Sequence, residues 1–300
     1  MLFHSPFPPP FHLLYKKAFM NDQAKLLAGD LNAYDAAPQG TRFPAFSAHV
    51  DQGRQDHYHR TTDVAGAAFN APPNGSKVAD VSVFAQDVSR AIAGAGLPND
   101  GRVLIRQRIF QTGRVQLDEA LSVEGEVGPY GEGPRGRHLN CYIAFRRANQ
   151  TVPLRMVTEH ILPFAEVPER SPKQAVKRDD PLAGMRAVGT MKLSPEKVAG
   201  YAQEVGNKIH TNPEFAQSRG YHAPLAQGLM QLTAMHGAIM RHAMPWEMDL
   251  ETRFIRPVFW DSELTLYSDA EGRLYRCIDE NGKVTAEAKL RHLTTKDMEP

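Results

Sequence analysis

The stretch from residue 224 to residue 244 most constrains how this chain can fold, because it is apolar on nearly every side of a helix. A helix with one apolar face lies on a surface, whereas a helix that is apolar all round must be buried on several sides. The apolar positions are Leu225, Leu229, Met230, Leu232, Met235, Ile239 and Met244. The sequence therefore predicts a central helix that other elements enclose.

Strand-like segments surround this helix in the second half of the chain. One precedes it, and Ser194-Pro195-Glu196 then has the cap and proline that are typical of a helix start. Several strands follow it, and Asn281-Gly282 is a strong hairpin signal. The predicted strands are residues 185–193, 251–258, 264–269, 274–278 and 283–293.

The first half repeats the same order of elements. Residues 78–95 have apolar positions at helical spacing, and strand-like segments follow at 103–110, 120–127, 138–146 and 151–162. A helix and then antiparallel strands, twice, predict an α+β double hot-dog fold with two antiparallel sheets, each wrapping a central helix. We expect an N-terminal extension (1–45), a degenerate hot-dog half (46–162), a linker (163–184) and a second half (185–300).

Composition excludes several kinds of partner. The net charge of +1 gives no global field for nucleic acid or acidic membranes. No apolar run reaches the length of a membrane span, and no clean signal peptide is present. The two cysteines, Cys141 and Cys277, lack CxxC spacing, which suggests a reducing compartment and argues against structural zinc. We expect a soluble cytoplasmic protein.

Three histidines close together in the first half raise the question of a metal site. His49, His57 and His59 have no cysteine or acidic cluster near them at ligand spacing. Zinc sites usually need three or four converging ligands, so the better interpretation is a strand with alternating residues and no metal.

A polar bend just before the central helix carries the chemistry. Residues 206–216 read Gly-Asn-Lys-Ile-His-Thr-Asn-Pro-Glu-Phe-Ala, and Pro-Leu-Ala-Gln-Gly follows at 224–228. This stretch resembles the MaoC-like (R)-specific enoyl-CoA hydratase family, with its Gly-Asp-x-Asn-Pro-[Leu/Ile/Val]-His-x-Asp-Pro-Glu-Phe-Ala signature and later Pro-Ile-x-His-Gly. The matching residues are Asn207, Ile209, His210, Pro213, Glu214, Phe215, Ala216, Gly220, Tyr221, Pro224 and Gly228.

The chain departs from the family signature at the charged positions. Counting back from His210, the family's catalytic aspartate falls on Val205, and its second aspartate becomes Asn212. The histidine of His-Gly becomes Gln227. The family's acid–base pair is therefore reduced to one histidine.

The resemblance implies a hydro-lyase that hydrates an enoyl-CoA thioester or dehydrates a 3-hydroxyacyl-CoA, without a cofactor or metal. It implies that His210 transfers protons and that the backbone N–H of Gly228, at a helix start, holds the thioester oxygen. Asn207 would orient water or the thioester. We expect Gln227, Tyr221 and Arg256 to bind substrate, and the protein to be a homodimer.

Two other functions stay open. The missing aspartate suits a hot-dog protein that binds acyl thioesters, or a partner subunit, without catalysis. A thioesterase on the same fold would use Glu204 or Glu214 as its base. A serine hydrolase is excluded because the sequence has no Gly-x-Ser-x-Gly elbow.

Overall fold

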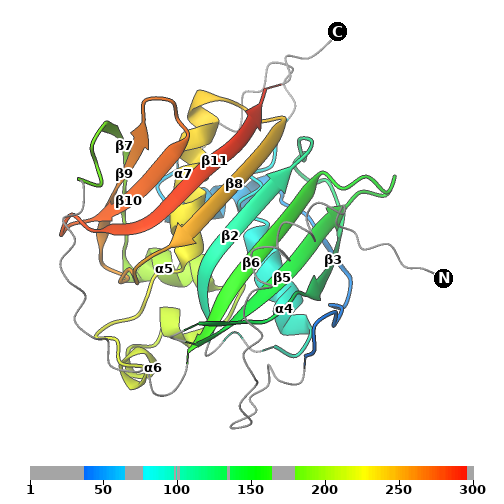
Figure 1. Cartoon of the computed structure of the whole chain (residues 1–300), viewed down its shortest axis with the longest axis horizontal. Coiled ribbons are helices and arrows are strands. Elements are labelled where there is room, and N and C mark those ends of the chain that lie inside the picture. The colour runs from blue at the N-terminus through cyan, green and yellow to red at the C-terminus, as the bar shows by residue number, and fades with distance from the viewer. Residues whose placement is uncertain are drawn as a thin grey trace.

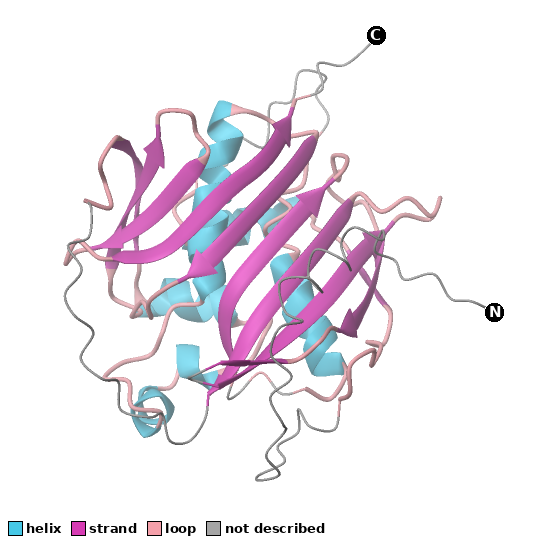
Figure 2. Ribbon diagram, viewed as in Figure 1, coloured by secondary structure: helices cyan, strands magenta, loops and turns pink. Residues whose placement is uncertain are grey.

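The computed structural model describes residues 37–64, 77–97, 99, 102–133, 136–163 and 180–295. Within these residues, eleven antiparallel strands form one sheet whose helices lie against a single face (Figures 1 and 2). The strand order is β1-β3-β5-β6-β2-β8-β11-β10-β9-β7, and β4 pairs with β5. This α+β arrangement confirms the predicted fold class.

Each half of the chain supplies one side of the sheet. The first half contributes β1 (Phe46–Ala48), α2 (Gln52–Thr61), α4 (Ala85–Gly94), β2 (Val103–Gln111), β3 (Leu121–Val127), β4 (Gly131–Gly133), β5 (Gly136–Arg146) and β6 (Leu154–Pro163). The second half contributes β7 (Met185–Lys192), α5 (Pro195–Ala202), the 3-10 helix η2 (Lys208–His210), α6 (Pro213–Ser218), α7 (Gly228–His242), β8 (Glu247–Phe254), β9 (Glu263–Asp269), β10 (Leu274–Asp279) and β11 (Val284–Thr294).

The two predicted sheets are continuous because β2 pairs with β8. The register runs from Arg106 opposite Arg253 to Gln111 opposite Met248. The guanidinium of Arg108 adds an ion pair to Asp249 across this seam, at 2.6 Å. The two halves are therefore joined by backbone hydrogen bonds as well as by side chains.

Helix α7 is the enclosed helix that its sequence predicts. Every residue from Leu229 to Met240 is buried. The helix begins at Gly228 rather than at Pro224, because Leu225 is extended and bridges Phe259. This delayed start leaves residues 224–227 as a loop that leads into the helix.

Helix α4 occupies the equivalent place behind the first half, but it is shorter than residues 78–95. The carboxylate of Asp80 accepts hydrogen bonds from the backbone N–H and the hydroxyl of Ser82, at 2.8 and 2.6 Å. Asp side chains that bind the backbone two residues on favour turns over helix. The regular helix therefore begins only at Ala85.

Most of the stretch with three histidines forms helix α2, which holds His57 and His59 but not His49, so the predicted strand is wrong there. Asp51 caps the helix by accepting from the N–H of Arg54 at 2.6 Å. The ring of His57 contacts the carbonyl of Gly200, whereas His59 pairs with Asp80. Among the described residues, no group of three or more His, Cys, Asp or Glu side chains could hold a metal ion.

Strand β8 ends before the predicted strand at 251–258 does. Past Phe254, the N–H groups of Ile255 and Arg256 both donate to the carbonyl of Thr285, which turns the chain out of the sheet.

No helix in the described part of the chain is long and apolar enough to cross a membrane. Most of the predicted extension and linker lies outside the described residues.

Candidate active site

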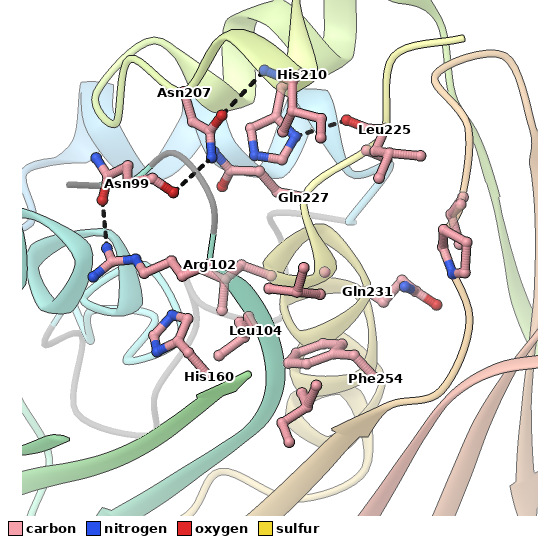
Figure 3. A pocket seen from close by; sticks show the side chains of 18 of the residues that line it. Asn99, Arg102, Leu104, His160, Asn207, His210, Leu225, Gln227, Gln231 and Phe254 are labelled. Atoms are coloured by element: carbon pink, nitrogen blue, oxygen red, sulfur yellow. Dashed lines mark hydrogen bonds between the residues drawn. The ribbon is translucent and has the colours of Figure 1, made fainter. Parts of the chain in front are cut away.

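A cavity of about 370 Å³ lies where the two halves meet. Its walls come from β2 and β6 of the first half, and from the loops at 205–210, 221–228 and 254–258 and the start of α7 in the second. Figure 3 shows Arg102 and His160 beside the strands of the first half, with Asn207 and His210 on the other side. The rim is apolar, because Val103 and Ile255, 41% and 48% exposed, lie on it.

All six residues that the sequence singles out line this one cavity. They come from four different segments of the second half, from the residue before η2 to the turn that follows β8. These residues are Asn207, His210, Tyr221, Gln227, Gly228 and Arg256.

The imidazole of His210 is oriented by the loop that leads into α7. Its Nδ1 lies 2.7 Å from the carbonyl oxygen of Leu225. A carbonyl can only accept, so Nδ1 carries the proton in the neutral ring and Nε2 carries the lone pair. Because Leu225 N–H in turn donates to the Ile209 carbonyl at 3.0 Å, the histidine and the loop fix each other.

The two asparagines of the motif stabilise local structure. Asn207 Oδ1 accepts from the N–H of Ile209 at 3.1 Å, and its Nδ2 donates to the carbonyl of Asn99 at 3.2 Å. Asn212 caps α6 by accepting from the N–H of Phe215 at 2.8 Å. Both polar atoms of the Asn207 side chain are thus bonded to the main chain beside the cavity.

The start of α7 presents hydrogen-bond donors to the cavity. The first N–H groups of a helix have no partner within the helix, and Gly228 is the first residue of α7. A Cβ atom on Gly228 would lie 2.9 Å from the ring of Phe254, so glycine is also required for packing. Any side chain at this position would displace the Phe254 ring.

Gln227, next to this helix start, is buried and held from the first half. Its Oε1 accepts from Gln86 Nε2 at 3.1 Å, and Gln86 lies on α4. Its Nε2 is buried without a hydrogen-bond partner among the described residues. Two donors, the Gly228 N–H and the Gln227 amide, therefore adjoin each other at one end of α7.

None of the described residues that line the cavity is an aspartate or glutamate. Val205, at the position of the family's catalytic aspartate, does line it. Glu204 and Glu214 do not, and Glu204 forms an ion pair with Arg54 at 2.6 Å. The two candidate bases of a thioesterase are therefore absent from the cavity wall.

Sequence reasoning missed two residues of the first half, Arg102 and His160. Arg102 is 9% exposed, and its guanidinium donates to the side-chain oxygen of Asn99. His160 lies in β6, and burial together with the Arg102 charge lowers the pKa of His160 well below its ordinary value. No motif marks either residue, since an arginine and a histidine in strand-like segments have no characteristic spacing.

A second group of buried histidines lies outside the cavity. Asp80 pairs with His59 Nε2 at 2.9 Å and with His236 Nδ1, on α7, at 2.7 Å. Burial alone would raise the pKa of the Asp80 carboxyl, but the charge and hydrogen bonds of His236 and His59 hold it below its usual range. His236 does not line the cavity.

Comparison with known proteins gives the same fold. Residues 176–292 match the family model "MaoC like domain". HtdX from Mycobacterium tuberculosis superposes with a TM-score of 0.66 at 18% identity, covering 83% of this chain and 99% of HtdX. A MaoC-like dehydratase from Phytophthora capsici gives 0.64 at 15% identity, covering 89% and 100%.

A third structure carries the name of the fold. The Mycobacterium tuberculosis protein RV0216, described as having a double hotdog fold, gives a TM-score of 0.56 at 13% identity, covering 86% of this chain and 97% of that one. No curated protein sequence matches the chain significantly. This chain has the double hot-dog fold, and over residues 176–292 its second half contains a MaoC-like domain.

Proposed function

We propose that the protein hydrates a 2-enoyl thioester, such as an enoyl-CoA, or dehydrates the corresponding 3-hydroxyacyl thioester. The observation that carries this proposal is the orientation of His210, whose Nδ1 is tied to the Leu225 carbonyl in the cavity that the start of α7 also lines. A histidine held in one tautomer can accept a proton from water at Nε2 and return it to carbon.

The reaction needs only the groups that line the cavity. His210 Nε2 takes a proton from water as the water oxygen bonds to the β-carbon. The electrons of the double bond move to the thioester oxygen, where the Gly228 N–H and the Gln227 amide stabilise the negative charge. The imidazolium then gives its proton to the α-carbon, so that the elements of water are added and the histidine is regenerated.

The cavity suits a thioester with a long arm. Its floor is formed by buried residues such as Leu229 and Val258, which an acyl group can contact. The apolar rim at Val103 and Ile255 gives a surface for the arm that connects the thioester to its carrier. Arg256 also lines the cavity, and its guanidinium, which donates to the Val284 carbonyl, would meet an anionic carrier group.

The test follows loss of enoyl absorbance with short and medium enoyl-CoAs. We expect His210→Ala to lower turnover by about a hundredfold to ten-thousandfold, the usual contribution of a general acid–base group. His222→Ala is the matched control, because His222 is an exposed histidine of the same loop that stacks on Phe259 instead of lining the cavity. Equal hydration by the wild type and His210→Ala would contradict the proposed role.

The absence of a carboxylate among the described cavity residues favours one other function, a thioester-binding protein without catalysis. Such a protein would bind acyl-CoA by calorimetry but hydrate none, and His210→Ala would change affinity only. Release of free CoA from the same substrates would instead indicate thioester hydrolysis.

A further inference from the structure

His160 is a buried polar side chain in the wall of the cavity. It is 5% exposed, its Nδ1 is fully buried without a partner among the described residues, and it lines the cavity. Because burial keeps the ring neutral, one of its nitrogens is a donor and the other an acceptor. A polar group that is buried and unsatisfied destabilises the folded state, so its retention points to a ligand that satisfies it.

Arg102 lies beside His160 and gives the same part of the cavity a positive charge. The two labelled side chains lie one above the other in Figure 3, and the Arg102 charge contributes to the lowered pKa of His160. The hydrogen bond from the Arg102 guanidinium to the Asn99 side chain fixes the orientation of the guanidinium. Asn99 is itself tied to the second half through its Nδ2, which donates to the Val205 carbonyl at 2.7 Å.

The polar pair is buried in the cavity wall, whereas the rim is apolar. Arg102 and His160 are buried, but Val103, the next residue along β2, is 41% exposed. A plain alkyl chain inside this cavity would cover both polar side chains and leave the buried Nδ1 of His160 without a hydrogen bond. An oxygen atom on the chain would accept from the guanidinium or the imidazole.

We propose that Arg102 and His160 form a specificity subsite for an oxygen function, a hydroxyl or a carboxylate, at the far end of the acyl group. This inference rests on the proposed function for the position of the thioester at Gly228. It adds that the substrate is an oxygen-bearing acyl thioester and that the first half of the chain selects it. The two residues of the subsite come from β6 and from the segment just before β2, outside the motif of the second half.

The test compares three saturated thioesters of equal chain length, which cannot be hydrated: pentanoyl-CoA, 5-hydroxypentanoyl-CoA and glutaryl-CoA. We expect calorimetry to give about tenfold tighter binding for at least one oxygen-bearing thioester than for pentanoyl-CoA. Preference for glutaryl-CoA over the hydroxyl compound would show that the substrate oxygen is anionic. Equal or tighter binding of pentanoyl-CoA by the wild type would overturn the subsite.

Two variants test whether Arg102 and His160 cause the preference for an oxygen-bearing thioester. Arg102→Met and His160→Leu should each remove it while leaving pentanoyl-CoA affinity unchanged or improved, whereas Arg256→Met, at the rim, should keep the ratio between the three ligands. Ligand-free His160→Leu should be at least as stable as the wild type in urea, since it removes an unsatisfied group. A variant that unfolds more easily would indicate a structural role and contradict the inference.

The outcomes separate this inference from the proposed function. Hydration of enoyl-CoAs by a wild type that prefers pentanoyl-CoA would leave the function standing and remove the subsite. Preference for an oxygen-bearing thioester without any hydration would do the reverse. Failure to bind all three thioesters would overturn both.

Discussion

The histidines around Asp80 and the histidine at position 160 are buried to a similar degree, but their surroundings differ. His59 and His236 share one carboxylate, with Ser82 donating to it as well. His160 has a cation for a neighbour and no hydrogen bond of its own among the described residues. The comparison teaches that burial alone does not mark a site, because of these three buried histidines only His160 lines the cavity.

The largest expected effect breaks the cluster of His59 and His236 around Asp80. Asp80→Asn removes the charge that two histidines face, and disrupting a buried ion pair costs about 3–5 kcal/mol of unfolding free energy. Urea denaturation followed by circular dichroism measures the loss. If the variant were as stable as the wild type, the cluster would not be a structural unit, and the contrast with His160 would fail.

The next effect concerns the second unsatisfied group of the cavity. Gln227→Leu removes the buried Nε2 donor next to Gly228, and loss of one such donor typically lowers kcat about 10²–10³-fold, or about 2.7–4 kcal/mol. Steady-state hydration kinetics measure it, with circular dichroism as the check on folding. A change in KM alone would show that the amide binds substrate without stabilising the transition state.

The contributions of His160 and of the Asp80 cluster to stability should also differ in their pH dependence. The pKa of His160 is lowered in the folded protein, so the unfolded chain binds more protons below its ordinary pKa of about 6.5. Stability is therefore lost as the pH falls from about 6.5, by at most about 1.4 kcal/mol per pH unit from this group. Urea denaturation at pH 7 and pH 5.5 measures this slope, which His160→Leu should reduce.

Asp80 also loses its contribution to stability in acid, but in a lower pH range than His160. Its lowered pKa means that its contribution to stability is complete above the ordinary aspartate pKa of about 3.9 and is lost only as the pH falls through its folded value. The loss between pH 7 and pH 5.5 should thus be insensitive to Asp80. An Asp80→Asn variant that lost the pH 7 to 5.5 slope would contradict this assignment.

The smallest effect on stability is expected at the ion pair between Arg108 and Asp249, which is less buried than Asp80 or His160. Asp249→Asn removes the ion pair to Arg108 at the seam, where both side chains are about a fifth exposed. Such partly exposed pairs contribute about 1 kcal/mol or less, so denaturation should barely shift. A loss as large as that from Asp80→Asn would mean that the seam, and not the Asp80 cluster, is what holds the two halves.

Periodicity predicted much of this fold, because the apolar pattern of α7 and the strand pattern of the second half extend over many residues. It failed where single side chains decide the local structure. Asp80 ends a helical pattern by bonding to Ser82, and α2 has so few apolar residues that its helical period is not visible. The cap at Asp51 was the available signal for α2.

The candidate site, like the fold, could be predicted from the sequence only in part. The motif brought together His210, Gly228 and four further residues of one cavity, since neighbours in a short stretch stay close after folding. Arg102 and His160 join them only because β2 and β6 pair with each other and β2 pairs with β8. Contacts between strands that are far apart in the sequence leave no local pattern to find.

The seam between β2 and β8 also sets an order of events during synthesis. Arg108 and Asp249, which face each other across it, are 141 positions apart in the chain. While the ribosome makes the intervening residues, one edge of the first-half sheet has no strand beside it, and open edges are templates for pairing with other chains. Pairing over such a separation is also slow to form. The second half therefore shields the first half from aggregation in addition to supplying the histidine and helix start of the candidate site.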